Sequence, residues 1–368
     1  MRQVWRVAWR LGVCVALLAW VFHAIFRNEG REAWEEQGRA WSQLSRWQQW
    51  QVGWSYGPPE LWRTLSQIRP AEGALSLVCM GLTIVLGMLR WRMVMRVQGL
   101  DLPVGRTAEI SLVAHFFNSF LLGSTGGDLM KAYYAARETH HLKTEAVVTV
   151  FVDRLIGLLS MLLFATLMMA PNYRLLAAHG RLAALAWPVV LMLLAGALVA
   201  GLSFWGGLSR VWPQARAWLR RLPMGDKLER SLEACRRFGK EQKLLAEALG
   251  LSMVLNLVCV LQVWSLARGL NLAINPVALL VIVPVIICVS ALPITVSGLG
   301  VRENLYVWML AAPQIAIGAT EALSLSLLAY AGSLFWSLIG GLTYVTFKAR
   351  HHLADVVATE PTATTEGG

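Results

Sequence analysis

Long apolar runs alternate with short polar segments along the chain, and most of the runs are long enough to cross a lipid bilayer. A membrane-spanning helix needs about 17–25 predominantly apolar residues, because each residue adds only about 1.5 Å along the axis. The pattern therefore predicts an all-α polytopic membrane protein with about six full transmembrane helices. The predicted spans are residues 11–26, 73–89, 146–170, 184–205, 249–266 and 323–347.

Two further apolar segments, residues 107–137 and 276–310, are interrupted in the middle. Each contains an apolar run, a break rich in Ser, Thr and Gly, a charged group just beyond it, and then aromatic residues. Both are predicted to be re-entrant or broken-helix elements; ordinary helical pairs with glycine kinks are the alternative. The glycines and charged residues concerned are Gly126, Gly127, Asp128 and Lys131 in the first element, and Gly298, Gly300, Arg302 and Glu303 in the second.

Basic residues between the apolar runs predict the side on which each loop lies, because cytoplasmic loops are enriched in Lys and Arg. Residues 207–247 carry ten Lys and Arg against five Asp and Glu, which predicts a basic cytoplasmic loop. With this side fixed, the two broken elements enter the membrane from opposite faces, as in the inverted repeats of transporters. Both chain termini are then cytoplasmic, and the protein lies in a plasma (inner) membrane.

Residues 27–72 form a Trp-rich segment in which six Arg balance six Glu. Such a neutral segment is predicted to lie externally at the membrane interface, where amphipathic indole rings sit among the headgroups. Binding of a sugar or a headgroup by these rings is the alternative. Residues 1–350 are interpreted as a single integral membrane domain, and residues 351–368 as a disordered C-terminal tail.

The composition narrows the class of protein further. Of the 368 residues, 56% are hydrophobic and 15% are charged, whereas soluble proteins carry about 25% charged residues. The net charge of +11 lies between the apolar runs, which indicates cytoplasmic loops and no nucleic-acid partner. Five scattered cysteines without a CxxC or a Cys/His cluster predict neither a disulfide framework nor a metal site.

Ionisable residues inside apolar runs are functional candidates, because a charge at the centre of a membrane costs about 2.5–3.5 kcal/mol on insertion scales. Arg302 and Glu303 are adjacent, so on a helix they point about 100° apart and are not expected simply to pair. One of them could form an ion pair with a charge on another element. Asp128 and Lys131 are three residues apart, and a local ion pair between them competes with a functional role.

Two further polar pairs occur in apolar surroundings. Asp153 and Arg154 stand near the inner end of the span 146–170, where a structural, snorkelling role competes with a functional one. His115 and Asn118 share one helix face, which suits hydrogen bonding between helices or a proton relay. The candidate proton carriers are Asp128, Asp153, Glu303 and His115.

The helix ends created by the breaks suggest what the charges bind. A helix that begins after Gly127 or Gly300 is expected to present unpaired N–H groups and the positive end of its dipole. With basic residues nearby, such an end suits an anion, most simply the phosphate of a lipid headgroup. No HExxH, GxSxG or Walker A motif is present, so the sequence argues against an enzyme and predicts no cofactor.

Four ordered motifs resemble those of a known family. They are "LRWRMVMRVQGLDLP", "NSFLLGSTGGDLMKAYYAARE", "FVDRLIGLL" and "LPITVSGLGVRE". Together they resemble the flippase-like transmembrane family of lysylphosphatidylglycerol synthases, over roughly residues 70–350. Family members often have Pro-Gly before the first Gly-Gly-Asp and an Arg three residues beyond it; here the Pro is missing and Lys131 takes the basic position.

The resemblance implies an integral membrane lipid translocator without the synthase domain, which binds a phosphate-bearing headgroup between its two broken-helix elements. The substrate is expected to be a membrane phospholipid or a polyprenyl-phosphate lipid, with a possible partner enzyme that makes or uses it. A membrane subunit or enzyme acting on polyprenyl-phosphate-linked sugars is the alternative, and a non-transporting scaffold is a third.

Overall fold

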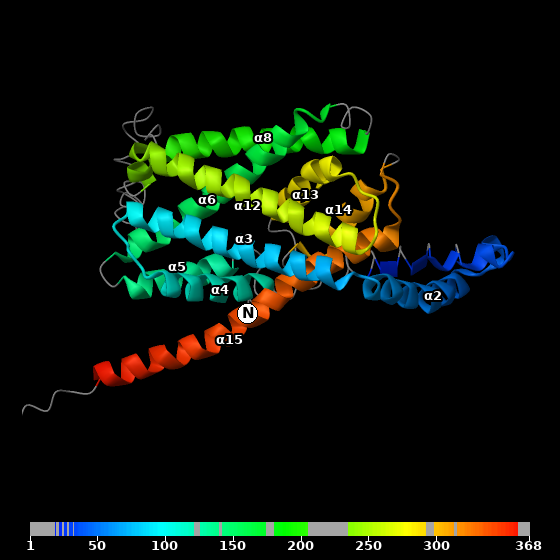
Figure 1. Ribbon diagram of the computed structural model, residues 1–368, viewed down its shortest axis with the longest axis horizontal. Helices are drawn as coiled ribbons and strands as arrows, with labels where there is room; N and C mark the ends of the chain where they lie inside the picture. The colour runs from blue at the N-terminus through cyan, green and yellow to red at the C-terminus, as the bar shows by residue number, and fades with distance from the viewer. Residues whose placement is uncertain are drawn as a thin grey trace, which may run out of the picture.

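Every element described in the computed structural model is a helix (Figure 1). The structure describes residues 33–120, 126–139, 142–173, 180–204, 235–291, 298–312 and 315–359, with some positions between 19 and 31. The helices are η1 (Trp41–Gln43), α2 (Arg46–Ser66), α3 (Pro70–Val97), α4 (Val104–Phe120), α5 (Gly126–Glu138), α6 (Lys143–Met169), α8 (Gly180–Phe204), α12 (Gln242–Gly269), α13 (Pro276–Ser290), α14 (Val301–Leu310) and α15 (Ala319–Thr359).

The prediction of an all-α polytopic membrane fold is confirmed. Four helices are long and apolar enough to cross a bilayer, namely α3, α6, α12 and the part of α15 up to Thr346. Helix α8 coincides with a fifth predicted span and contains the shorter apolar stretch Ala186–Leu202. The first predicted span, residues 11–26, lies almost entirely outside the described residues, as does the part of the basic loop between 205 and 234.

Rows of exposed apolar side chains indicate which faces of the helices are suited to contact lipid. On α3 the exposed residues recur every three or four positions and form one stripe along the helix. Similar rows mark α8, α12 and α15, and a soluble protein rarely exposes apolar patches of this extent. The residues are Leu75, Val78, Leu82, Val85 and Leu89 on α3; Trp187, Leu191, Leu194 and Leu198 on α8; Val254, Leu257 and Leu261 on α12; and Phe335, Leu338, Leu342 and Val345 on α15.

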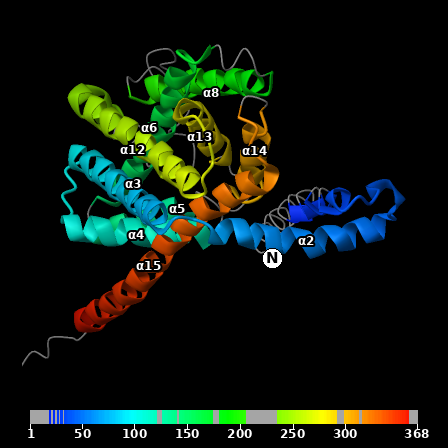
Figure 2. The same cartoon turned by 45° about the vertical axis from the view of Figure 1, so that its right-hand side comes forward.

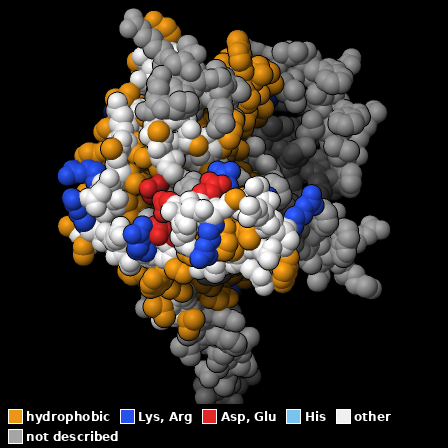
Figure 3. All heavy atoms as spheres, turned by 90° about the vertical axis from the view of Figure 1, so that its right-hand side faces the viewer, with side chains coloured by type: hydrophobic (Ala, Val, Ile, Leu, Met, Phe, Trp, Pro, Cys, Tyr) orange, Lys and Arg blue, Asp and Glu red, His pale blue; other side chains and the backbone are white. Residues whose placement is uncertain are grey.

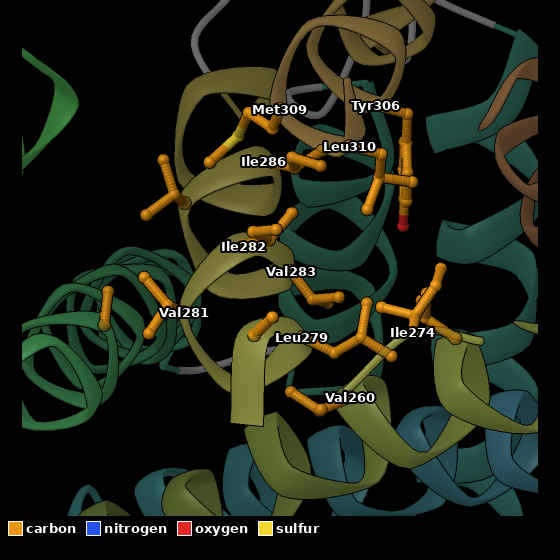
Figure 4. Packing of buried hydrophobic residues seen from close by; sticks show 14 of the residues in the cluster. Val260, Ile274, Leu279, Val281, Ile282, Val283, Ile286, Tyr306, Met309 and Leu310 are labelled. Carbon is orange, nitrogen blue, oxygen red and sulfur yellow. The ribbon is translucent and has the colours of Figure 1, made fainter. Parts of the chain in front are cut away.

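Helix α13 lies inside the protein, with its side chains in the largest buried apolar cluster. Figure 4 shows Leu279, Ile282 and Ile286 of α13 beside Leu310 of α14 and Val260 of α12. Asn275 accepts a hydrogen bond from the Val277 backbone N–H at 2.9 Å, and Pro276 takes the first helical position, so the sequence sets the start of the helix. A helix of this kind is held by protein contacts on several sides.

The two interrupted segments both fold as two helices on either side of a break. The first gives α4 and α5, which pack against each other, and the second gives α13 and α14, which do likewise. The longest of the four has 17 residues, or about 25 Å, which is short of the hydrocarbon thickness of about 30 Å. Figures 1 and 2 show α4 and α5 toward one end of the bundle and α13 and α14 toward the other.

The ends of the chain leave the bundle in different ways. Helix α2 projects from the end of the bundle near α14, while α15 packs against α4 and α14 and then extends away (Figures 1 and 2). Helix α15 continues to Thr359, into the tail predicted to be disordered, because nothing before Pro361 interrupts a helix. The remainder of the tail lies outside the described residues.

Candidate functional site

The broken elements meet at one cavity of about 380 Å³, which we call the central cavity. Its wall includes the last turns of α4 and α13, the first turns of α14, and polar side chains of α6 and α15. Helix ends that flank the two breaks are therefore brought together although some 170 residues separate them in the sequence. The polar residues of the wall are His115, Asn118, Ser119, Arg154, Ser290, Arg302, Tyr306, Tyr330 and Ser333.

Arg302 and Glu303 form an ion pair with each other, so the expectation that they would not simply pair is wrong. The Glu303 side chain is fully buried and turns back toward the start of α14, where its Oε2 accepts the Gly300 backbone N–H at 2.6 Å. This turn brings Oε1 within reach of the long Arg302 side chain. Arg302 also donates to Ser326 Oγ at 3.2 Å and lies 4.6 Å from the centre of the Tyr330 ring.

The turn before α14 requires its two glycines. Gly298 and Gly300 have φ angles of +71° and +82°, a backbone region that residues with a Cβ rarely adopt. At Gly298 a Cβ would also lie 2.9 Å from the Ser290 Cβ. The sequence pattern thus identified the position of the turn, and the glycines act through the backbone. They place Arg302 at the wall of the central cavity.

Gly127, at the start of α5, allows a close approach between α4 and α5. The Asn118 side-chain oxygen accepts the Gly127 N–H at 2.8 Å, and a Cβ on Gly127 would lie 2.1 Å from the Ala114 carbonyl oxygen. The backbone N–H groups of Gly127 and Gly300 are therefore both bonded to side chains. A buried N–H without a partner costs free energy, so these two groups are not open to an anion. The prediction of unpaired N–H groups concerns the residues that follow the glycines, and it stays a prediction.

A methyl group at Gly127 should disrupt this contact. We expect Gly127→Ala to lower the free energy of unfolding by about 1–3 kcal/mol, because the close-packed backbone of α4 must move. Gly105→Ala, at the start of α4 and with open space around it, is the matched control and should change stability by less than about 0.5 kcal/mol. The midpoint of thermal unfolding in detergent measures both. Equal midpoints for the two variants would contradict the close approach.

Helices α5 and α6 are joined by two crossed ion pairs. Asp128 contacts Arg154 at 3.6 Å (Oδ2 to Nε), and Lys131 contacts Asp153 at 3.2 Å (Nζ to Oδ2). The interpretation of Asp128 and Lys131 as a local pair is therefore wrong: α6 supplies a closer partner for each of them. Charges buried between helices are stabilised only when such partners are present.

Asp153 has a second cationic partner that the sequence analysis did not single out. Arg90 of α3 donates from Nε to Asp153 Oδ1 at 2.8 Å and from Nη1 to Ser252 Oγ of α12 at 3.1 Å. The side chains of Arg90 and Asp153 are only 12% and 8% exposed. Arg90 follows directly after the predicted span 73–89, but α3 continues to Val97, so Arg90 lies within the helix. Its place in the "LRWRM" motif was the one sequence feature that could have marked Arg90 as a candidate residue.

His115 and Asn118 separate the central cavity from a smaller one of about 240 Å³, which we call the side cavity. Asp128 and Lys131 line the side cavity. The His115 Nε2 lies 3.2 Å from the Ser333 carbonyl oxygen, so α4 and α15 hold the ring in place. His115 and Asn118 therefore lie on one helix face, as predicted, and this face lines both the central cavity and the side cavity.

The predicted site residues therefore occupy different positions around the cavities. Four of them, His115, Asn118, Arg154 and Arg302, reach the central cavity. Asp153 and Glu303 lie behind the wall as buried partners of cations, and Gly126 is buried at the start of α5. Besides Arg90, the structure adds Tyr330, Ser290 and Ser333, which carry no pattern in the sequence, and Tyr306, one of the aromatic residues that follow the second break.

The helical fold, its outward-facing apolar stripes and its buried charges together define an integral membrane protein. The chain belongs to the family described as lysylphosphatidylglycerol synthase TM region, whose sequence model matches residues 47–341. The resemblance seen in the four motifs is confirmed, and the match includes both broken elements and both cavities. No curated protein matches the chain.

Proposed function

We propose that the protein translocates a phosphate-bearing lipid between the two leaflets of the membrane, with the headgroup in the central cavity. The observation that carries this proposal is the convergence of the two broken elements on a polar cavity whose wall holds Arg154 and Arg302. Guanidinium groups bind phosphate through paired N–H donors, and partial burial strengthens the bond. Around the cavity, the lipid-facing stripes on the helices leave room for acyl chains in the bilayer.

The charge balance of the wall supports an anionic headgroup. Arg302 is neutralised by Glu303, whereas Arg154 meets Asp128 only at 3.6 Å and its side chain remains 34% exposed. Asp153 is already shared by Arg90 and Lys131. The three cations Arg90, Lys131 and Arg154 thus face the two carboxylates Asp128 and Asp153, and a phosphate would add the missing negative charge.

In this proposal the protein lies in the inner membrane with the basic loop and both termini in the cytoplasm. The broken elements then enter from opposite faces and meet near the midplane, as in transporters with inverted repeats. A phospholipid and a polyprenyl-phosphate lipid share the phosphate that the cavity would bind. A partner enzyme that makes or uses the lipid would fit either substrate.

Leaflet exchange of labelled lipids in proteoliposomes tests the proposal. We expect headgroup-dependent exchange for the wild type and a fall of at least about tenfold for Arg154→Gln, since a charge-assisted hydrogen bond contributes about 1.5–3 kcal/mol. Arg154 is a better probe than Arg302, because removing Arg302 leaves buried Glu303 without its cation. Arg268→Gln, an exposed Arg on α12 outside both cavities, is the matched control.

The lipids in this assay are phosphatidylglycerol, phosphatidylethanolamine, phosphatidylcholine and a short polyprenyl phosphate. If the polyprenyl phosphate alone is exchanged, the substrate is a polyprenyl-phosphate lipid and not a phospholipid. Wild-type exchange that Arg154→Gln leaves unchanged would contradict the assignment of the headgroup to the central cavity. If none of the lipids is exchanged, the proposal of a lipid translocator is wrong, and the alternative of a non-transporting scaffold is favoured.

A further inference from the structure

A third cavity of about 600 Å³ lies on the helical hairpin that α2 forms with the described helical residues before it. We call it the hairpin cavity; its described lining residues are His23, Arg27, Arg46, Trp47, Gln49 and Trp50. Its volume falls within the range of small-molecule sites, about 300–1,000 Å³. The family match begins at residue 47, so half of these residues precede it.

The tryptophans of this cavity lie near the start of α2, at the end of the helix that is farther from the bundle. Helix α2 runs away from the bundle in both views (Figures 1 and 2) and ends at Ser66, just before α3 begins. Trp47 stands 19 residue steps before Ser66, which places it about 28 Å further out along the helix axis. Trp62, near the end of α2, lies much closer to the start of α3 than Trp47 does.

The two rings of the cavity form one flat aromatic surface. Trp47 and Trp50 stack with their ring centroids 4.9 Å apart and their planes 12° apart. They remain 63% and 40% exposed, although indole rings gain free energy when they are covered. Figure 3 views the molecule from the end at which the hairpin projects, where charged and hydrophobic side chains lie side by side. A ligand with a flat, weakly polar face would cover these rings.

Cations surround the aromatic surface. Arg27 donates to the Gln49 side-chain oxygen at 3.0 Å, and Gln49 donates to the Leu44 carbonyl at 3.2 Å, so both side chains are held in place. Arg46 is exposed and makes no ion pair with any of the described residues. None of the six described lining residues is acidic. The cavity therefore offers two positive charges to a ligand.

We propose that the hairpin cavity binds an acidic saccharide, with one sugar ring over the Trp47 and Trp50 rings and its carboxylate or phosphate at Arg27 and Arg46. One face of a sugar ring presents C–H groups, whose partial positive charge suits the negative face of an indole. The ring hydroxyls suit His23 and Gln49 as hydrogen-bond partners. An acyl chain would bring no polar group to the four polar residues of the lining. The proposal does not depend on lipid transport.

Calorimetric titration of the full chain in phosphatidylcholine nanodiscs tests the site. The probes are tetragalacturonate, neutral galactotetraose and a hexamer of oligothymidine, and a further set of nanodiscs contains galacturonosyl diacylglycerol. We expect tetragalacturonate to bind at least about tenfold more tightly than galactotetraose, since a charge-assisted hydrogen bond contributes about 1.5–3 kcal/mol. Trp47→Ala and Arg46→Gln should each weaken binding by about tenfold or more.

The matched controls lie on the same helix outside the cavity: Trp62→Ala and Arg63→Gln should change affinity by less than about twofold. Binding of tetragalacturonate supports a soluble or polymeric glycan, and binding of the glycolipid alone supports a lipid-linked source. Preference for oligothymidine would overturn the saccharide in favour of a nucleic acid. No binding of any acidic saccharide, or equal losses in Trp47→Ala and Trp62→Ala, would overturn the site.

Discussion

Asp153→Asn is expected to destabilise the protein strongly. The variant leaves Arg90 and Lys131 as two buried cations without a carboxylate, and breaking a buried ion pair costs about 3–5 kcal/mol. The midpoint of thermal unfolding in detergent should fall by an amount of the order of 5–15 °C. Ser252 and the Trp91 ring, which Lys131 approaches at 4.4 Å, cannot neutralise these charges.

Two comparisons separate this effect from a general response to the loss of a carboxylate. Asp101→Asn removes a carboxylate that is 74% exposed and lies near Arg92 and Arg96, so it should cost less than about 1 kcal/mol. Adding Lys131→Met to Asp153→Asn removes one of the two unpaired cations and should recover part of the loss. A double variant less stable than the sum of its single changes would contradict the buried network.

Substitutions of Glu303 are expected to have an effect at least as large, and a series separates the two roles of its carboxylate. Glu303→Gln keeps an oxygen that can accept the Gly300 N–H but loses the charge beside Arg302, with an expected cost of about 3–5 kcal/mol. Glu303→Ala also removes the helix cap and should cost about 1 kcal/mol more. The same thermal midpoint, with size-exclusion profiles, measures both.

Removal of both charges tests whether the pair acts as a unit. Arg302→Gln combined with Glu303→Gln should be more stable than Glu303→Gln alone, because no buried charge is then left without a partner. Glu60→Gln, which breaks a pair with Arg63 on the surface of α2, should cost less than about 1 kcal/mol. If Glu303→Gln proves as mild as Glu60→Gln, Glu303 does not hold Arg302 at the cavity wall.

The breaks in the helices were predictable because their causes are local. Gly298 and Gly300 mark a turn with positive φ angles, and α14 begins at the next residue. The interruption before α5 and the short apolar runs on either side were likewise visible in the sequence. Direction relative to the membrane remains a prediction, since it depends on the basic loop, most of which lies outside the described residues.

The partners of the charges were not predictable, because they come from distant parts of the chain. Arg90 lies 63 residues from Asp153 and 162 from Ser252, yet it bonds both. Sequence spacing suggested that Asp128 would pair with Lys131, but α6 carries a closer opposite charge for each. Likewise, Glu303 pairs with its neighbour Arg302 because it first turns back to the Gly300 N–H.

The sequence by itself determined that this is an all-α membrane protein of a known family, where most of its spans lie, and where two of its helices break. Hydropathy and helix-breaking residues act over one or two turns, so these features need no knowledge of distant contacts. Only the tertiary structure decided that helix ends beside both breaks line one cavity, which charges neutralise one another, and that Trp47 lies at the end of α2 that is far from α3. Those outcomes follow from packing between helices, because buried charges and N–H groups take whichever partners the folded chain brings within reach.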